Sequence, residues 1–448
     1  MRTLITASLF ALAAAALALG PVDNPPLAGN LAGLSAGDAA ALASVDDLRR
    51  AGPEALNALL DENDRHPGTV SPATIDAVAG QHDASWSRLF WYTDLQAARA
   101  QAKSQNKPIL YLRLLGKLTD EYSCANSRFF RTVLYANTNV SALLRDRFIL
   151  VWGTERPVPV ITVDYGDGRV LKRTITGNSA HYVLDAQGNI VDVLPGLYDP
   201  VAFARILTAA AQAATSTIIE SRRSYWQQSQ ATLASEWRRD TAAPTPAPSL
   251  FSPARPNADA AMPLAPSKGE VERPLVRAVL PPAARQVAAQ PAPNAAAAAG
   301  QAKGKSMAEG PVIRRLSREF AEVLDARNTD DATWKEVANR HLADARLDAS
   351  SIALIRSQNP TAYADAAALA RVIEQFQRSI AADTVRNNYL FRAQILGWLQ
   401  AAPSPLELEA LNQRVYSELF LTPRTDPWLG LVPESTYTAL TDDGCTTH

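Results

Sequence analysis

Two positions three residues apart, Cys124 and Ser127, are the first candidates for chemistry in this sequence. The residues around them (SCANSRFF, 123–130) predict the start of a helix, and Arg128 adds positive potential in its first turn. Unpaired backbone N–H groups and the helix dipole favour an anion there, so Cys124 is a candidate thiolate that forms mixed disulfides or senses oxidants. The alternative is a buried, inert cysteine kept by packing, since free cysteines are among the most buried residues.

Alternating strands and helices must position these residues. Residues 108–114 (PILYLRL) predict a buried strand, 127–144 a helix and 148–152 the next strand. Turn signals at 165–168 (YGDG) and 186–189 (AQGN) predict two hairpins. Asp199-Pro200 then predicts the capped start of a helix. This order favours an α/β fold, a mixed sheet flanked by helices.

Residues from about 91 to 207 resemble the thioredoxin-like superfamily, specifically its secreted bacterial branch. Four motifs carry the resemblance: K-P-I-L at 107–110, C-A-N-S at 124–127, G-N-S-A at 177–180 and L-D-A-Q-G at 184–188. In the family these places hold the lead-in to the central strand, the redox pair C-x-x-C, the loop G-T-P-T and a hairpin. The resemblance implies a thioredoxin-like fold and thiol–disulfide chemistry.

The sequence departs from this family in three places. Ser127 replaces the second cysteine, Ser179 replaces the cis-proline that faces the active cysteine, and about six extra residues (116–122) precede Cys124. A dithiol oxidoreductase needs both sulfurs, because the second thiolate releases the first from its mixed disulfide. The C-x-x-S pattern resembles monothiol members, which keep the attacking thiol and borrow the resolving one.

The candidate site residues follow from this comparison. Cys124 and Ser127 are the candidate catalytic residues, and Ser179, Arg128 and His181 are candidate binding residues. His181 begins a predicted strand beside the altered loop, where a structural histidine is the commoner outcome. The five histidines show no metal-binding spacing, so we expect no metal and no cofactor.

The start of the chain predicts export. Arg2 precedes an apolar run at 4–19, and small residues at Ala16 and Ala18 fit a cleavage site, so residues 1–18 are interpreted as a signal peptide. An uncleaved membrane anchor is the alternative, and the mature chain is expected to lack a membrane span. Such a protein is periplasmic or secreted.

Export makes a disulfide conceivable, because disulfides persist outside the cytoplasm. The chain has two cysteines, so Cys445 is the one intramolecular candidate to pair with Cys124. Otherwise Cys445 is an exposed thiol in a frayed end.

Composition shifts divide the chain into further parts. Residues 35–80 predict a helical prefix, and 85–239 the thioredoxin-like domain with a helical extension. Residues 240–310 form an Ala/Pro-rich linker, although 271–280 are apolar enough to dock as a strand. Residues 311–448 predict a separate, mostly helical C-terminal domain.

Two local patterns describe that C-terminal domain. Ser404-Pro405-Leu406-Glu407 predicts a capping box that begins a helix. A group of aromatic residues is expected to pack the tail onto the helices: Trp398, Tyr416, Phe420, Trp428 and Tyr437.

Charge and site together leave two hypotheses for function. Lys and Arg total 44 against 45 Asp and Glu, which argues against a dedicated nucleic-acid binder. The first hypothesis is a redox-degenerate scaffold that binds another envelope or secreted protein. The second is a monothiol thiol–disulfide oxidoreductase or isomerase with Cys124 as its nucleophile.

Overall fold

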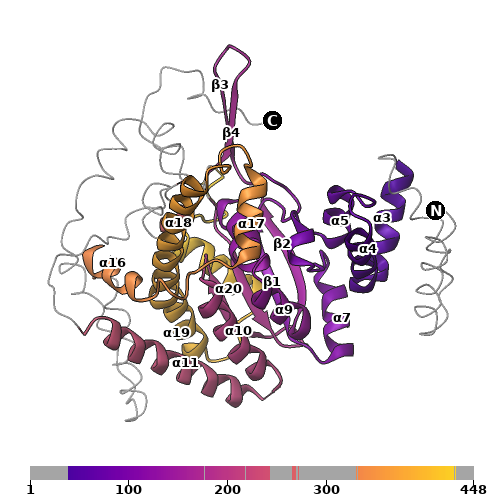
Figure 1. The fold of residues 1–448 in the computed structure, drawn as a ribbon. Helices are drawn as coiled ribbons and strands as arrows, with labels where there is room; N and C mark the ends of the chain where they lie inside the picture. The colour runs from indigo at the N-terminus through magenta and orange to yellow at the C-terminus, as the bar shows by residue number, and fades with distance from the viewer. Residues whose placement is uncertain are drawn as a thin grey trace, which may run out of the picture. The chain divides into compact units, whose positions relative to one another are not determined.

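The computed structural model describes residues 39–175, 177–216, 218–242, 265–268, 271, 329, 331–427 and 429 (Figure 1). These residues divide into two compact units between Trp91 and Tyr92. The expected signal peptide and Cys445 lie outside the described residues, as does most of the expected linker. The predicted cleavage of the signal peptide and the candidate pairing of Cys445 with Cys124 therefore stay predictions.

The first unit is helical, as the sequence predicts. Its helices are α3 (Ala39–Ala51), α4 (Pro53–Arg65), α5 (Pro72–Ala79) and α6 (Ala84–Ser87). The Ser71 side chain accepts a hydrogen bond from the Thr74 N–H at 3.1 Å, and Pro72 occupies the first helical position of α5. Leucines at helical spacing fill the core of this unit: Leu48, Leu56, Leu59 and Leu60.

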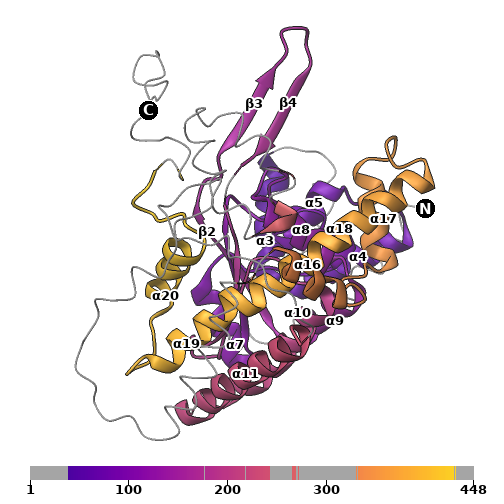
Figure 2. The ribbon, with the colours of Figure 1, turned by 90° about the vertical axis from the view of Figure 1, so that its left-hand side faces the viewer.

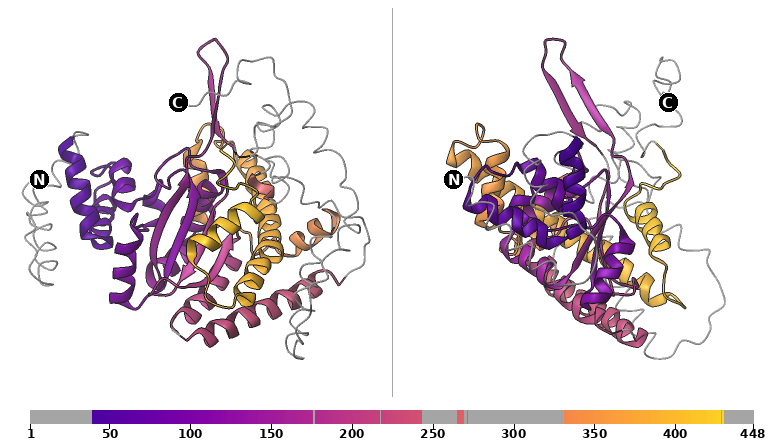
Figure 3. Two further views of the ribbon diagram at one scale, coloured as in Figure 1. Left: turned by 180° about the vertical axis from the view of Figure 1, so that it is seen from behind. Right: turned by 90° about the vertical axis from the view of Figure 1, so that its right-hand side faces the viewer.

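A four-stranded mixed sheet is the centre of the second unit (Figure 3). Its strands are β1 (Ile109–Leu115), β2 (Ile149–Arg156), β5 (Ala180–Leu184) and β6 (Ile190–Pro195), in the order β2-β1-β5-β6. Strand β1 pairs parallel with β2 and antiparallel with β5, and β5 pairs antiparallel with β6. Every residue of β1 is buried, because both faces of this central strand are covered.

Helices connect and cover these strands in the predicted order. They are α7 (Leu95–Gln105), α8 (Ala125–Phe130), η2 (Arg131–Tyr135), α9 (Thr138–Arg147) and α10 (Pro200–Ala214). Asn137 breaks the long helical segment and caps α9 by accepting from the Asn139 and Val140 N–H groups. Asp199 caps α10 through the Ala202 N–H at 2.7 Å, so the predicted cap is confirmed.

A two-stranded hairpin separates β2 from β5. Strands β3 (Val160–Asp164) and β4 (Val170–Thr174) form their own small sheet, which extends away from the four-stranded sheet (Figures 1 and 2). The predicted turn is confirmed: Tyr165 N–H donates to the Arg169 carbonyl, and Gly166 N–H donates to Asp164 Oδ1.

The later helices belong to the same unit as the sheet, which corrects the expectation of a separate C-terminal domain. They are α11 (Ile219–Asp240), α16 (Asp331–Arg340), α17 (Ala349–Gln358), α18 (Ala366–Arg386), η6 (Asn387–Arg392), α19 (Ala393–Ala401), α20 (Leu408–Arg414) and η7 (Val415–Leu419). Helix α19 packs along α11, and η6 packs against β6. Figure 2 shows these helices beside the sheet.

Buried ion pairs explain why the helices do not separate. Arg392 of η6 contacts Asp192 of β6 at 2.6 Å, and both side chains are almost completely buried. Arg113 of β1 pairs with Glu155 of β2 and with Glu409 of α20. A buried charge that loses its partner is strongly destabilising, so these pairs bind the helices to the sheet.

Helix α20 begins later than the capping box predicts. Glu407 has extended backbone angles and is the residue before the helix, so Ser404 caps nothing here. The ion pair from Glu409 to Arg113 positions this first turn instead.

One short piece of the expected linker packs on the second unit. The Ser267 N–H donates to Asp383 at 3.3 Å, and the Lys268 ammonium lies 3.4 Å from Asn178 Oδ1. Both residues are about as buried as the core, at 2% and 3% exposure. Within the described ranges, no helix is both long and apolar enough to cross a membrane.

Candidate functional site

Cys124 lies directly before α8, where its spacing predicts it. The chain leaves β1 at Leu115, forms a loop and returns so that the Cys124 N–H donates to the Leu115 carbonyl at 3.3 Å. Gly116 begins this loop with φ of 78°, a left-handed conformation that glycine tolerates. The extra residues before the cysteine therefore fold into a turn that delivers it to the end of the central strand.

Two hydroxyls contact the thiol. The Cys124 sulfur lies 3.0 Å from Ser179 Oγ and 3.6 Å from Ser127 Oγ. Ser127 Oγ also lies 2.8 Å from the Cys124 carbonyl oxygen and 2.7 Å from Ser123 Oγ. The structure thus brings together three of the predicted site residues, Cys124, Ser127 and Ser179. Ser127 is a hydrogen-bonding partner of the thiol that cannot form a disulfide with it.

The thiol is sealed from solvent. Cys124, Ser127 and Ser179 each have 0% exposure. A Cβ built on Gly177 would lie 3.3 Å from the Cys124 Cβ and 3.0 Å from the Leu115 side chain, so the loop is closely packed against the cysteine. Cys124 is a free thiol, and its candidate partner Cys445 lies outside the described residues.

Residues from the C-terminal half close the site. The Tyr416 hydroxyl donates to the Asn178 carbonyl at 2.9 Å, directly before Ser179. Asn178 Oδ1 accepts from Asn126 at 3.2 Å and lies within 3.4 Å of the Lys268 ammonium. Tyr416 is fully buried, and burial raises its pKa well above the ordinary tyrosine value, so its hydroxyl stays a donor. The main-chain carbonyl of Asn178, beside the thiol, therefore already accepts a hydrogen bond from the protein's own Tyr416.

Arg128 of α8, a candidate binding residue, and Arg131 of η2 both hydrogen-bond to segments that lie beside the thiol. Arg128 donates to Thr174 Oγ1 at 3.0 Å, and Thr174 Oγ1 in turn donates to the Ser123 carbonyl at 3.2 Å. Arg131 donates to the Asp120 carbonyl at 3.2 Å. These contacts fasten β4 and the loop around the thiol.

His181 is a completely buried core residue of β5. Its Nε2 hydrogen-bonds the Tyr135 hydroxyl at 2.6 Å, and the rings of Phe130 and Phe203 lie 4.6 and 5.1 Å from its ring centre. Complete burial lowers the pKa of His181 to about 3, so the ring is neutral at physiological pH. The hydrogen bond and the aromatic packing support its structural interpretation.

The sequence did not predict the residues that cover this site and support the strand beside it. Arg113 stands in an otherwise apolar strand, and Glu155, Glu409 and Tyr111 surround it. A charged residue inside a buried run is a signal that a distant partner exists. Asn178 and Tyr416 carry no such local signal, because the contact between them spans 238 residues.

With the sulfur at 0% exposure, the arrangement presents no accessible thiol to a substrate disulfide. In the part of the chain that the structure describes, no cluster of His, Cys, Asp and Glu could hold a metal ion. Comparisons with family models, with curated proteins and with solved structures each return no match.

Proposed function

We propose that this protein is an exported, thioredoxin-like binding scaffold that has lost thiol–disulfide turnover. The order strand, helix, strand, hairpin and helix around the mixed sheet is the one that the resemblance implies. The signal-peptide pattern at the start of the sequence supports export.

The observation that carries the proposal is the complete burial of Cys124. Thiol–disulfide exchange requires in-line access of a second sulfur to the attacking thiolate. Here the hydroxyls of Ser127 and Ser179 and the loop at Gly177 occupy the surroundings of the sulfur. A monothiol mechanism, the competing hypothesis, requires this region to open first.

The β3–β4 hairpin is the surface that we propose for the partner, an exported protein that adds an extended segment to the hairpin edge. Within the described residues the small sheet has two strands, so each has one unpaired edge. Val160, Tyr165 and Val170 are between 44% and 59% exposed. A lone hairpin is marginally stable in water, and an added strand both satisfies its edge and covers its apolar side chains.

Affinity capture with three baits tests this function. The wild type, Cys124→Ser and a Val160→Lys/Val170→Lys variant are each incubated with envelope extract, with and without dithiothreitol. The proposal predicts the same specific partner on the first two baits under both conditions and its loss from the hairpin variant. Capture that requires Cys124 and is released by dithiothreitol would establish the monothiol mechanism instead.

An insulin-reduction assay supplies the catalytic control. With dithiothreitol as donor, we expect the protein to leave the uncatalysed rate unchanged. Turnover that vanishes in Cys124→Ser would overturn the proposal, and turnover that also vanishes in Cys445→Ser would identify Cys445 as the resolving thiol.

A further inference from the structure

A small pocket lies between four helical segments of the second unit, and it does not involve Cys124. It has a volume of about 150 Å³ and lies between the start of α10, helix α11, the segment after α16, and the junction of α18 with η6. Since a water molecule takes up about 30 Å³, the pocket has room for roughly five small groups. Its size therefore suits a small metabolite rather than a peptide.

Buried polar residues build the floor of this pocket. Asp199 is 1% exposed, and its N–H donates to Thr384 Oγ1 at 2.7 Å. The Tyr389 hydroxyl donates to Asp240 at 2.6 Å, and Asp240 also contacts His341 Nε2 at 2.9 Å. Hydrogen bonds between several helices thus hold these pocket residues in place.

The two carboxylate oxygens of Asp199 differ in their hydrogen bonds to the described residues. Oδ1 accepts the capping hydrogen bond from Ala202, whereas Oδ2 has no hydrogen-bond partner among the described residues. A buried polar atom without a partner is costly, and it is most costly when it carries charge. Burial also raises the pKa of Asp199 to about 6, so the group is still mainly ionised at neutral pH.

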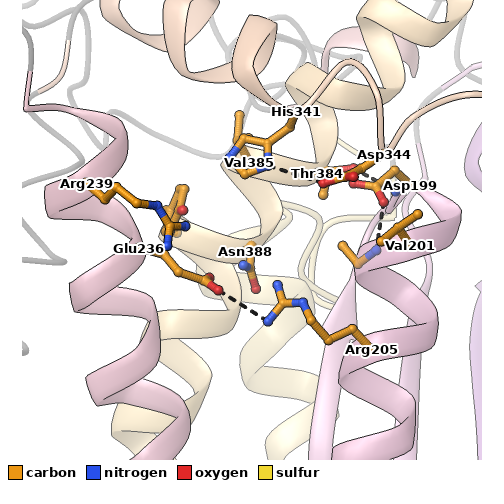
Figure 4. A pocket seen from close by; sticks show the side chains of 12 residues that line it. Asp199, Val201, Arg205, Glu236, Arg239, His341, Asp344, Thr384, Val385 and Asn388 are labelled. Atoms are coloured by element: carbon orange, nitrogen blue, oxygen red, sulfur yellow. Dashed lines mark hydrogen bonds and ion pairs between the residues drawn. The ribbon is translucent and has the colours of Figure 1, made fainter.

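Charges on the pocket wall have an uneven distribution. Figure 4 shows Asp199 and Asp344 on one side, with Glu236 and Arg239 opposite them. Arg205 pairs with Glu236 at 3.3 Å, so that carboxylate already has a cation. The three carboxylates outnumber the two guanidiniums, which leaves the Asp199 side suited to a cationic group.

We propose that this pocket binds a small ligand with a primary ammonium group, and that the ammonium donates to Asp199 Oδ2. The ammonium supplies a charge-assisted hydrogen bond to an oxygen that otherwise has none. A simple alkylamine and a small amino acid share this group, and they differ in whether a carboxylate can also contact Arg205 or Arg239.

Calorimetric titration of the full mature chain tests the proposal, with ethylamine, alanine and acetate as probes at equal ionic strength. Ethylamine binding is expected. Stronger binding of alanine would identify an amino acid as the ligand class, and equal binding a simple amine. Binding of acetate alone, or no heat from ethylamine and alanine, would overturn the proposal and leave a pocket that holds water.

Asp199→Asn is the decisive variant, because asparagine keeps the helix cap while it replaces the charged oxygen. Ethylamine affinity should fall by about tenfold or more in Asp199→Asn, and it should change little in the matched cap variant Asp365→Asn, which alters an N-cap aspartate of α18 outside the pocket. Circular dichroism and Tm verify that both variants fold. Equal affinity of Asp199→Asn and the wild type would overturn the proposal.

The pH dependence gives a second readout. Wild-type affinity for ethylamine should fall as the pH is lowered from 7 to 5, because protonation of Asp199 removes the acceptor charge. Asp344 and His341 face the same carboxylate from the segment after α16, Thr384 faces it from α18, and Glu236 lies on α11. Their contribution is the residual pH dependence of Asp199→Asn, and an unchanged pH profile in that variant would contradict the role of Asp199.

Discussion

Cys124 and Asp199 are both buried, but the two side chains differ in the contacts around them. The Cys124 sulfur has 0% exposure, and the hydroxyls of Ser127 and Ser179 contact it. Asp199 is nearly as buried, yet it lines a pocket, and its Oδ2 has no hydrogen-bond partner among the described residues. The C-x-x-S pattern singles out Cys124 in the sequence, whereas a pocket and a carboxylate oxygen without a hydrogen-bond partner among the described residues make Asp199 the better candidate for binding a ligand.

Opening the sealed region should produce the largest change in stability. Tyr416→Ala removes a buried ring and its hydrogen bond to Asn178, so we expect a loss of about 3–5 kcal/mol in the free energy of unfolding. Tyr165→Ala, on the exposed hairpin, is the matched control and should cost less than about 1 kcal/mol. Urea denaturation measures both, and equal losses would contradict the assignment of Tyr416 as the closing residue.

At the Asp199 pocket, we expect instead that the free energy of unfolding depends on pH. The pKa of Asp199 rises from 3.8 to about 6 on folding, so the folded protein holds this proton more tightly. The resulting stability is complete below about pH 4 and is lost as the pH rises through about 6. It amounts to about 3 kcal/mol from the shift.

Comparison with Asp199→Asn isolates that contribution. The wild type should lose stability relative to the variant between pH 4 and pH 6.5 in urea titrations. A constant difference across this range would show that the carboxyl is solvated or paired in solution.

The smallest of these effects is expected at the thiol itself. Cys124→Ser keeps a hydrogen-bonding group beside Ser179 at the cost of a smaller buried atom, so a loss of about 1–2 kcal/mol is expected in urea denaturation. Ethylamine titration should give the same affinity as the wild type. A changed affinity would show that the two regions are coupled.

Local signals predicted most of the secondary structure. Ser71 and Asp199 cap their helices as expected, and both hairpin turns lie where glycine and aspartate place them. These features depend on residues within about four positions of one another, which a single sequence displays.

The C-terminal region shows what local signals miss. Its helices were predicted, but their attachment to the sheet depends on pairs such as Arg392 with Asp192, 200 residues apart. The capping box predicted at Ser404 does not form, because Glu407 has extended backbone angles and directly precedes the helix. Likewise, the motif around Cys124 predicted its place before α8 but not the cover that Tyr416 provides.

The most direct test of the account is the accessibility of Cys124 in the folded protein. A Cys445→Ser variant leaves one cysteine to react with iodoacetamide, and mass spectrometry follows its labelling with and without urea. The account predicts labelling only at the rate at which the protein opens or unfolds, and acceleration in Tyr416→Ala. Rapid labelling of the native protein without denaturant, at the rate of a free thiol, would contradict it.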